Sequence, residues 1–250
     1  MTDLTLGKLP NLRALIVPDP GYTLVDMDLQ RADLWVVAWE SQDANLKYKL
    51  RREVEDPTQD IHSQNALTIF GAVDYYKRRF GKVFAHGTNY GSQPPKMAKE
   101  LGVTQREAQE AQNKWFQAHP GIQTWHTRTQ YNLAKTKMVA NAFGYRRFFF
   151  DRPDNCFTDA LAWVPASTVA LVINFILDAI DETLPHVQLL LQVHDSLTLQ
   201  VPTPLLHSTI PQLQTIASGV IVPYPEPLNI PVSFATSTES WGKVESYAAP

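Results

Sequence analysis

The sequence predicts an α+β fold, in which helices are combined with an antiparallel sheet. Several segments repeat their apolar residues at helical spacing, and Leu189–Val201 has the pattern of a β-hairpin that bends at His194–Asp195. The 250 residues are 44% hydrophobic and 19% charged, which is typical of a globular protein with one large or two small domains. The single cysteine excludes a disulfide framework and a cysteine-rich zinc site. We therefore expect a hydrophobic core without disulfide cross-links.

The other expected elements follow from local patterns along the chain. Tyr22–Asp28 is mostly apolar and follows a Pro–Gly turn, which favours a short strand. Thr104 followed by Glu107 is the pattern of a capping box at the start of a helix. Pro165 fits the first turn of another helix, because the amide at that position makes no helical hydrogen bond. Helices are expected over residues 32–41, 60–71, 74–89, 104–117, 122–137 and 165–180.

The sequence shows neither a secretory signal nor a long apolar run. The segment MTDLTLGKLPNLR lacks the apolar region of a signal peptide. The longest apolar run, Val169–Leu177, is interrupted by Asn174 and is expected to be too short to span a bilayer. We therefore expect an intracellular protein that is not secreted and does not enter a membrane.

Charge is distributed unevenly along the chain. The totals of 22 Lys and Arg against 25 Asp and Glu give a formal charge of -3, so the chain as a whole is not a polycation. However, Tyr75–Lys99 contains six Lys and Arg and no acid, and Arg128–Arg147 contains five and no acid. Such stretches are either solvated helix faces or surfaces that bind polyanions, and charge alone does not separate these alternatives.

Two acidic residues stand at the ends of expected strands. Taken singly, Asp28 is best explained as a helix N-cap and Asp195 as a turn residue. Taken together, two strand-end carboxylates that are distant in sequence can meet at one edge of a sheet. Such a pair is costly unless a divalent cation neutralises it, which implies Mg²⁺. Two carboxylates that bridge two ions can align an in-line phosphoryl displacement.

A second candidate site lies in the basic stretch, where four residues are spaced by four. Each step of four drifts by only about 40° around a helix, so all four side chains share one face. Two cations, an imidazole and a phenol on one face fit a nucleoside triphosphate, with the cations on the phosphates and the rings on the base or sugar. The alternative is an exposed amphipathic face. The four residues are Arg78, Lys82, His86 and Tyr90.

Several segments follow one another along the chain: VDMDLQRADLWVVAWESQD, DIHSQNA, RRFGKVFAHGTNYG, LGVTQREAQ with WFQAHPGI, NAFGYRRF and LQVHDSL. In this order they resemble the family A DNA polymerases of the bacterial polymerase I type, in their palm and fingers region only. The resemblance extends roughly from Leu9 to Glu245. Each segment alone is weakly to moderately specific, whereas the set in this order is highly specific.

The resemblance implies a template-directed DNA polymerase that adds deoxynucleoside triphosphates to a primer 3′-hydroxyl with two Mg²⁺ ions, or Mn²⁺. It implies that Asp28, Asp195 and the backbone carbonyl of Leu29 hold the metals, and that Lys82 joins the two acids as a catalytic residue by donating a proton to the leaving group. The implied nucleotide-binding residues are Arg78, His62, His86, Tyr90, Asp33 and Leu29. The implied DNA-binding residues are Arg146, Arg147, Gln192 and His194.

The resemblance also implies a subdomain arrangement and partners. An antiparallel-sheet palm would comprise residues 1–50 and 155–250, and mostly helical fingers would comprise residues 51–154. The implied arrangement is that of a right-hand polymerase that lacks the thumb. The implied partners are primer-template DNA, deoxynucleoside triphosphates and a separate chain that supplies a thumb or exonuclease. The implied location is the cytoplasm of a bacterial or phage-infected cell.

Several residues depart from the family pattern. Asp33 stands where the family has a Glu that rejects ribonucleotides, and His86 stands where it has an aromatic stacking residue. Further departures, most of them at duplex-contacting positions, are Trp35, Asp159, Trp163–Thr168 and Ser196. Two alternatives therefore stay open: a catalytically silent DNA-binding or scaffold subunit, and a polymerase that tolerates ribonucleotides. Asp26 is expected to be an acid that supports the metal-binding residues or caps a neighbouring element. His119 is expected to be structural or at the surface.

Overall fold

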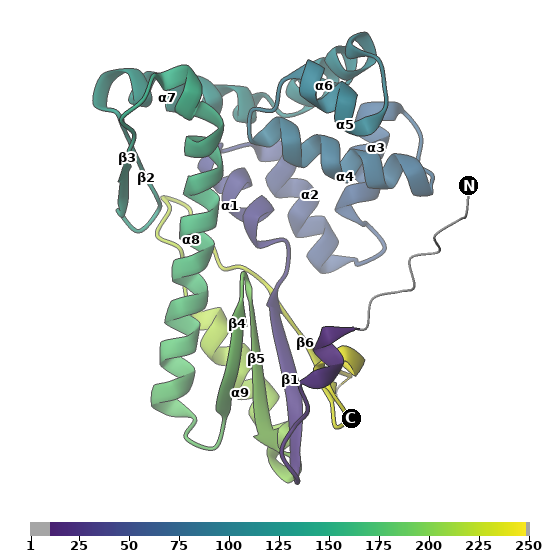
Figure 1. Cartoon of the computed structure of the whole chain (residues 1–250), viewed down its shortest axis with the longest axis vertical. Helices are drawn as coiled ribbons and strands as arrows, with labels where there is room; N and C mark the ends of the chain where they lie inside the picture. The colour runs from purple at the N-terminus through teal and green to yellow at the C-terminus, as the bar shows by residue number, and fades with distance from the viewer. Residues whose placement is uncertain (1–10, 249–250) are drawn as a thin grey trace, which may run out of the picture. The chain divides into compact units, whose positions relative to one another are not determined.

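The structure is a computed structural model that describes residues 11–248 and divides them into two compact units (Figure 1). The sheet unit contains the chain up to Gln30, Ala170–Ile221 and the chain from Asn229 onward. The helical unit contains Arg31–Val169 and Val222–Leu228. Residues 1–10, which include most of the segment expected to lack a secretory signal, lie outside the described part of the chain. The units do not coincide with the expected palm and fingers limits of 1–50, 51–154 and 155–250, which stay a prediction.

The sheet unit is built around one antiparallel sheet with strand order β4-β5-β1-β6-β7. β1 lies in the middle, paired with β5 on one side and β6 on the other, and its Leu24, Val25 and Met27 are fully buried. The helix α9 packs against β5 and β6. The strands are β1 (Tyr22–Leu29), β4 (Gln188–Val193), β5 (Ser196–Pro202), β6 (Val232–Ser237) and β7 (Glu245–Ser246), and α9 is Leu206–Gly219.

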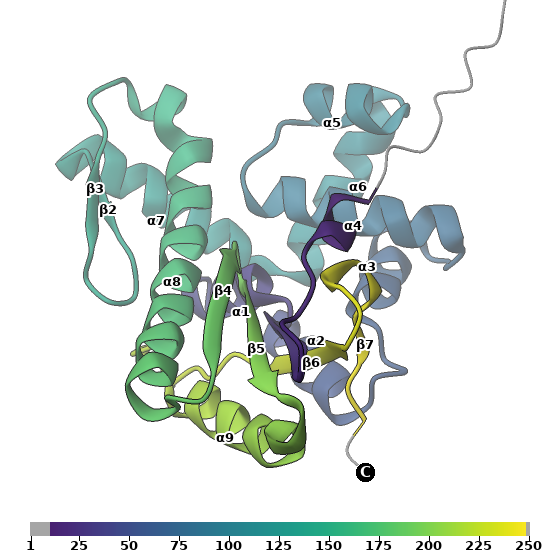
Figure 2. The same cartoon turned by 60° about the horizontal axis from the view of Figure 1, so that its bottom comes forward.

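The helical unit holds α1 to α7 and a small hairpin, β2–β3, that lies beside α7 (Figure 2). Its core includes Phe84 and Trp115, both almost completely buried. Gly81 lets α3 and α4 approach closely, because a Cβ there would lie 2.9 Å from the backbone nitrogen of Ala66. The elements are α1 (Ala32–Glu40), α2 (Ala44–Glu55), α3 (Ile61–Phe70), α4 (Tyr75–Asn89), α5 (Pro94–Leu101), α6 (Gln105–Ala118), α7 (Pro120–Thr136), β2 (Met138–Ala140) and β3 (Arg146–Phe148).

The long helix α8 (Pro153–Thr183) corrects two expectations. It begins 12 residues before the expected start, so Pro165 lies inside it. The lost backbone hydrogen bond at Pro165 costs about 3 kcal/mol, but apolar residues at helical spacing, from Phe157 through Leu161 to Val164, are buried and continue the helix past it.

The second expectation, that the apolar run around Val169–Leu177 is too short to span a membrane, is wrong for α8. Among the described residues, this 31-residue helix is the one long and apolar enough to cross a bilayer, by length and composition only. Half of its most apolar window is buried inside the protein, including Val172, Ile173 and Ile176, which is the ordinary pattern of a core helix.

The remaining sequence expectations for the elements are confirmed. The other five helices begin and end within two residues of the expected limits, and the hairpin bends at His194–Asp195. The capping box is present, because Thr104 Oγ1 accepts from the Glu107 amide and the Glu107 carboxylate accepts from the Thr104 amide. The elements not expected from the sequence are α2, α5, α9, β2, β3, β6 and β7.

A buried polar network joins the start of α2 to the start of α7. Asp43 caps α2 by accepting from the Leu46 amide at 2.8 Å, and it also accepts from the Gly121 amide at 3.0 Å. His119, fully buried, lies with Nδ1 2.9 Å from Asp43 Oδ1 and Nε2 3.3 Å from Lys49 Nζ. Burial lowers the pKa of Lys49 to about 8 and also lowers that of His119. His119 is therefore structural, as expected.

Candidate active site

Asp28 and Asp195 come together at one edge of the sheet in the sheet unit. Asp28 stands opposite Ser196 in the β1–β5 pairing, and the Leu29 amide donates to the Asp195 carbonyl oxygen at 3.0 Å. The bend between β4 and β5 is tight because His194 takes a left-handed conformation with φ 55. The expectation that the two acids meet at neighbouring strand ends is confirmed. Asp28 is not the N-cap of α1, since that position is Arg31.

The residues at this edge fit a magnesium site that is completed by substrate. Among the residues that the structure describes, no group of three or more His, Cys, Asp and Glu side chains could hold a metal. Mg²⁺ is commonly bound by only one or two carboxylates, with water and substrate phosphates filling the other positions. The carboxylates of Asp28 and Asp195 meet this requirement, and the carbonyl of Leu29 is the third candidate ligand.

Asp26 lies two residues before Asp28 on the same face of β1 and has a different role. Its Oδ1 accepts from Thr198 Oγ1 at 3.1 Å and from Trp241 Nε1 at 3.1 Å. These contacts tie β1 to β5 and to the segment after β6. Asp26 thus supports the strand that carries Asp28.

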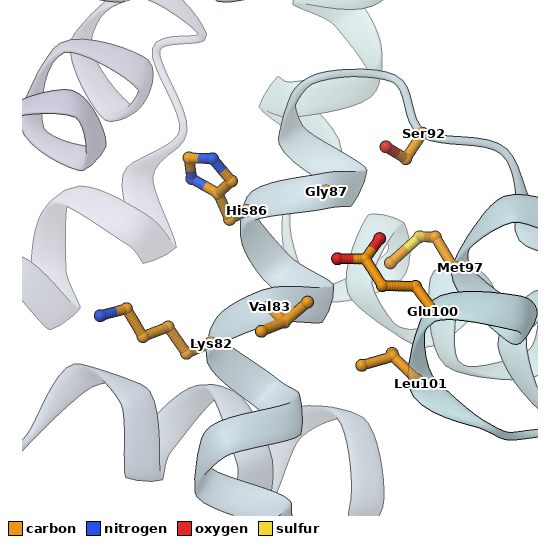
Figure 3. Close-up of a pocket in the computed structure, with 8 residues that line it drawn as sticks. All are labelled: Lys82, Val83, His86, Gly87, Ser92, Met97, Glu100 and Leu101. Carbon is orange, nitrogen blue, oxygen red and sulfur yellow. The ribbon is translucent and has the colours of Figure 1, made fainter. Parts of the chain in front are cut away.

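The helical unit carries the predicted cationic face on α4. Arg78 donates from Nε and Nη2 to the two carboxylate oxygens of Asp60, at 2.7 and 2.8 Å. Figure 3 shows Lys82 and His86 pointing to the same side of α4, away from Val83. The rings of His86 and Tyr90 meet edge-on at a centroid distance of 4.6 Å. The four residues thus lie along one side of α4, as their spacing predicts.

Asp33 and Tyr90 contact each other within the helical unit. Burial raises the pKa of the Tyr90 hydroxyl, and the negative charge of Asp33 and a hydrogen bond to it raise it further. Tyr90 therefore stays protonated and donates to Asp33. Another departure from the family, Trp35, is buried beside Trp39 with the ring centroids 5.4 Å apart, so it belongs to the core.

His62 lies in α3 and is buried without a hydrogen-bond partner on either ring nitrogen among the described residues. Burial and the charge of Arg31 lower its pKa to about 4. Lys82 and Arg78 act in the same direction, against the opposing charge of Asp60. His62 is therefore neutral near pH 7 and keeps both nitrogens for a ligand.

We expect His62 to make stability sensitive to acid. Its pKa is about 6.5 in the unfolded chain and about 4 in the folded one, so the unfolded chain binds the proton first as the pH falls. The contribution of His62 is therefore complete above pH 6.5 and is lost between pH 6.5 and 4. Denaturant unfolding at pH 7.5 and 5.0 should show that wild type loses about 1–2 kcal/mol more stability than His62→Gln. An equal loss in both proteins would contradict this assignment.

The predicted DNA-binding residues lie in two places. Arg146 and Arg147 are exposed in β3, and the Arg147 guanidinium lies 4.8 Å from the centroid of the Phe149 ring. Gln192 and His194 belong to the β4–β5 hairpin of the other unit, where Gln192 donates to Asn174 Oδ1 at 3.0 Å. Both pairs are accessible, and their role with DNA stays a prediction.

Asp60 is a residue of the site that was not predicted from the sequence. It caps α3 and holds Arg78, and these two roles share one carboxylate. Burial alone would raise the pKa of Asp60, but hydrogen bonds from Arg78 and Ser63 outweigh this and lower it. The signal in the sequence was the acid at the start of the DIH segment.

The two candidate sites belong to different units. The acids lie in the sheet unit, whereas the cationic face of α4 and His62 lie in the helical unit. Their meeting around one substrate therefore stays a prediction.

Comparisons with known proteins show which family the sequence matches. A sequence model described as DNA polymerase family A matches residues 7–243. The thermostable DNA polymerase I of Thermus filiformis is 31% identical over 206 residues, which are 76% of this chain and 24% of that protein. The Thermus aquaticus enzyme of the same name is 26% identical over 245 residues, 92% of this chain and 28% of that protein. The chain thus spans about a quarter of the length of these relatives.

A solved structure is similar in fold. It is the POL domain of Pol1 from M. smegmatis in complex with DNA primer-template and dNTP. The TM-score is 0.77 at 22% sequence identity, and the match covers 92% of this chain and 41% of that chain. The expected α+β class, with an antiparallel sheet and a mostly helical second part, is confirmed.

Proposed function

The chain belongs to DNA polymerase family A, and from this premise we propose that it adds deoxynucleoside triphosphates to a primer 3′-hydroxyl under the direction of a template. The observation that carries the proposal is the position of Asp28 and Asp195 at adjacent strand ends, where Asp28 stands opposite Ser196 and the Leu29 amide donates to the Asp195 carbonyl oxygen at 3.0 Å. Two acids fixed so closely by backbone pairing support divalent-metal binding.

We assign the metal-binding role to Asp28, Asp195 and the carbonyl of Leu29. Two Mg²⁺ ions, or Mn²⁺, bound there would lower the pKa of the primer hydroxyl and offset the charge that develops on the α-phosphate and the leaving pyrophosphate. The acids themselves contribute two fixed negative charges on a rigid sheet, so they need little reorganisation when the ions bind.

The triphosphate-binding role falls to the helical unit. Arg78 and Lys82 supply positive charge, and the neutral His62 can donate one hydrogen bond to a phosphate oxygen. Lys82 is the proposed proton donor to the leaving pyrophosphate. Tyr90 and His86 are proposed to pack on the base and sugar.

The nucleic-acid partner in this proposal is a primer-template duplex. Arg146 and Arg147 would contact its backbone, while Gln192 and His194 would contact the primer end near the acids. Basic contacts of this kind predict binding that weakens with salt. A separate chain that supplies a thumb or exonuclease and a cytoplasmic location in a bacterial or phage-infected cell belong to the same proposal.

The test is extension of a labelled primer on a template with all four deoxynucleoside triphosphates. We expect extension with Mg²⁺ and none when EDTA is added. Template-dependent DNA binding without extension in Mg²⁺ or Mn²⁺ would instead support the silent-subunit alternative.

The ribonucleotide-tolerant alternative rests on Asp33. It is one methylene shorter than the family's Glu, and it is engaged by Tyr90. We expect Asp33→Glu to raise the preference for dATP over ATP, as a ratio of kcat/KM values, by about tenfold, because the longer carboxylate would fill the space of a 2′-hydroxyl. An unchanged ratio would show that Asp33 does not select the sugar. Asp154→Glu, at the start of α8, is the matched control and should leave the ratio unchanged.

A further inference from the structure

Arg31 connects the first strand to the helical unit in an unusual backbone conformation. It is the N-cap of α1 with φ 54 and ψ 30, the left-handed region. For a residue with a Cβ this conformation costs about 1–2 kcal/mol, so the surrounding structure must hold it in place. The side chain of Arg31 is directed by two acids from other parts of the helical unit.

The first contact of Arg31 is with Glu53. Its Nε and Nη2 donate to the two carboxylate oxygens of Glu53 at 3.4 and 3.2 Å. The second contact is with Asp60, whose Oδ1 lies 3.7 Å from Arg31 Nη2. The same oxygen accepts from Arg78 Nη2 at 2.8 Å. Two guanidinium groups therefore meet at one carboxylate oxygen.

Both acids are fixed by the start of α3. Asp60 Oδ2 accepts from the amide and the hydroxyl of Ser63, at 2.8 and 2.7 Å. Glu53 Oε1 accepts from the Ile61 amide at 3.2 Å. Because the acids are held, the two arginines are held as well. Their side chains remain 37% and 46% exposed, and a guanidinium has five N–H donors, so donors are left for a ligand.

His62, the second residue of α3, gives independent evidence for a bound ligand. His62 is buried, and neither of its ring nitrogens has a hydrogen-bond partner among the described residues. The positive charges of Arg31, Lys82 and Arg78 all act on this ring. Three cations thus surround one unpartnered imidazole near the N-terminus of α3, a place that favours an anion.

We propose that Arg31 is a further triphosphate-binding residue that contacts the phosphate chain of the incoming nucleotide together with Arg78. The proposal rests on the proposed function, because it adds a residue to that nucleotide site. Asp60 is the positioning residue, because one of its carboxylate oxygens holds both guanidinium groups.

The test measures binding of tripolyphosphate to the whole chain by calorimetry at low salt. We expect Arg31→Gln to raise the Kd about three- to tenfold, since a partly exposed charge contact is worth less than a buried one. Arg31→Lys should recover part of the loss. The matched control is Arg52→Gln, an exposed arginine on α2 that pairs with Glu55 and should change the Kd less than about twofold.

Two further variants distinguish a direct phosphate contact from a purely structural ion pair. Glu53→Gln breaks the Glu53 ion pair but keeps the Arg31 charge, so it should leave the Kd unchanged or lower it. If Glu53→Gln weakens binding as much as Arg31→Gln does, the ion pair matters structurally and the proposal is overturned. If Arg78→Gln weakens binding while Arg31→Gln stays within about twofold of wild type, Arg31 is not a ligand, although the proposed function survives. If neither variant weakens binding, the nucleotide site itself is wrong.

Discussion

Asp28→Asn and Asp195→Asn are each expected to slow primer extension by on the order of 10³-fold or more, equivalent to about 4 kcal/mol of barrier. Asparagine keeps the size of the side chain but removes the charge that would bind Mg²⁺. The sheet should stay intact, because the β1–β5 pairing and the bond from the Leu29 amide use backbone atoms. The measurement is single-turnover extension of a labelled primer with saturating Mg²⁺ and dATP.

The matched control is Asp26→Asn, two residues earlier on the same face of β1. The amide of asparagine can still accept from Thr198 and Trp241, so we expect extension within a few-fold of wild type. Thermal unfolding of the Asp28 and Asp195 variants should stay close to that of wild type, because the strand pairing at this edge uses backbone atoms. Wild-type rates in either catalytic variant would remove the metal assignment.

Asp43→Ala is expected to lower the free energy of unfolding by about 3–5 kcal/mol. The substitution removes the cap of α2 and leaves the Gly121 amide and His119 without their shared acceptor. It also removes the negative charge that acts on the buried Lys49. A buried cation that loses its counter-charge is the costliest part of this change. Denaturant unfolding at pH 7 measures it.

The exposed cap of α4 provides the comparison. Asp74 accepts from the Lys77 amide at 2.8 Å, and its side chain is 50% exposed. Asp74→Ala should therefore cost only about 1 kcal/mol, the ordinary value of a lost N-cap. Equal losses in the two variants would mean that the buried network contributes nothing beyond capping.

The sequence predicted those parts of the fold that local chemistry determines. The capping box at Thr104 and the bend at His194–Asp195 are short-range patterns, and both are present. The start of α8 was missed because Pro165 is a local signal for the beginning of a helix. In the structure, the burial of Phe157 and Leu161 extends the helix to an earlier start. Similarly, α2 was missed because its helix is mostly polar and its cap, Asp43, is stabilised by residues far along the chain.

In the candidate site, too, the features set by local sequence were predicted and those set by long-range packing were not. The spacing of Arg78 and Lys82 along α4 could be read from the sequence, and the meeting of Asp28 with Asp195 followed from their positions at strand ends. The shared carboxylate of Asp60 could not be predicted, because it depends on how α1, α3 and α4 approach one another.

The central place of β1 in the sheet has a consequence for biosynthesis. β1 ends at Leu29, but its two neighbours are β5, which begins at Ser196, and β6, which begins at Val232. The growing polypeptide therefore cannot pair this strand on either side until more than 160 further residues have been translated. The helices between β1 and β5 form from residues that are close in sequence, so they can fold first. The edge of the sheet that carries Asp28 and Asp195 assembles last, because long-range strand pairing is slow.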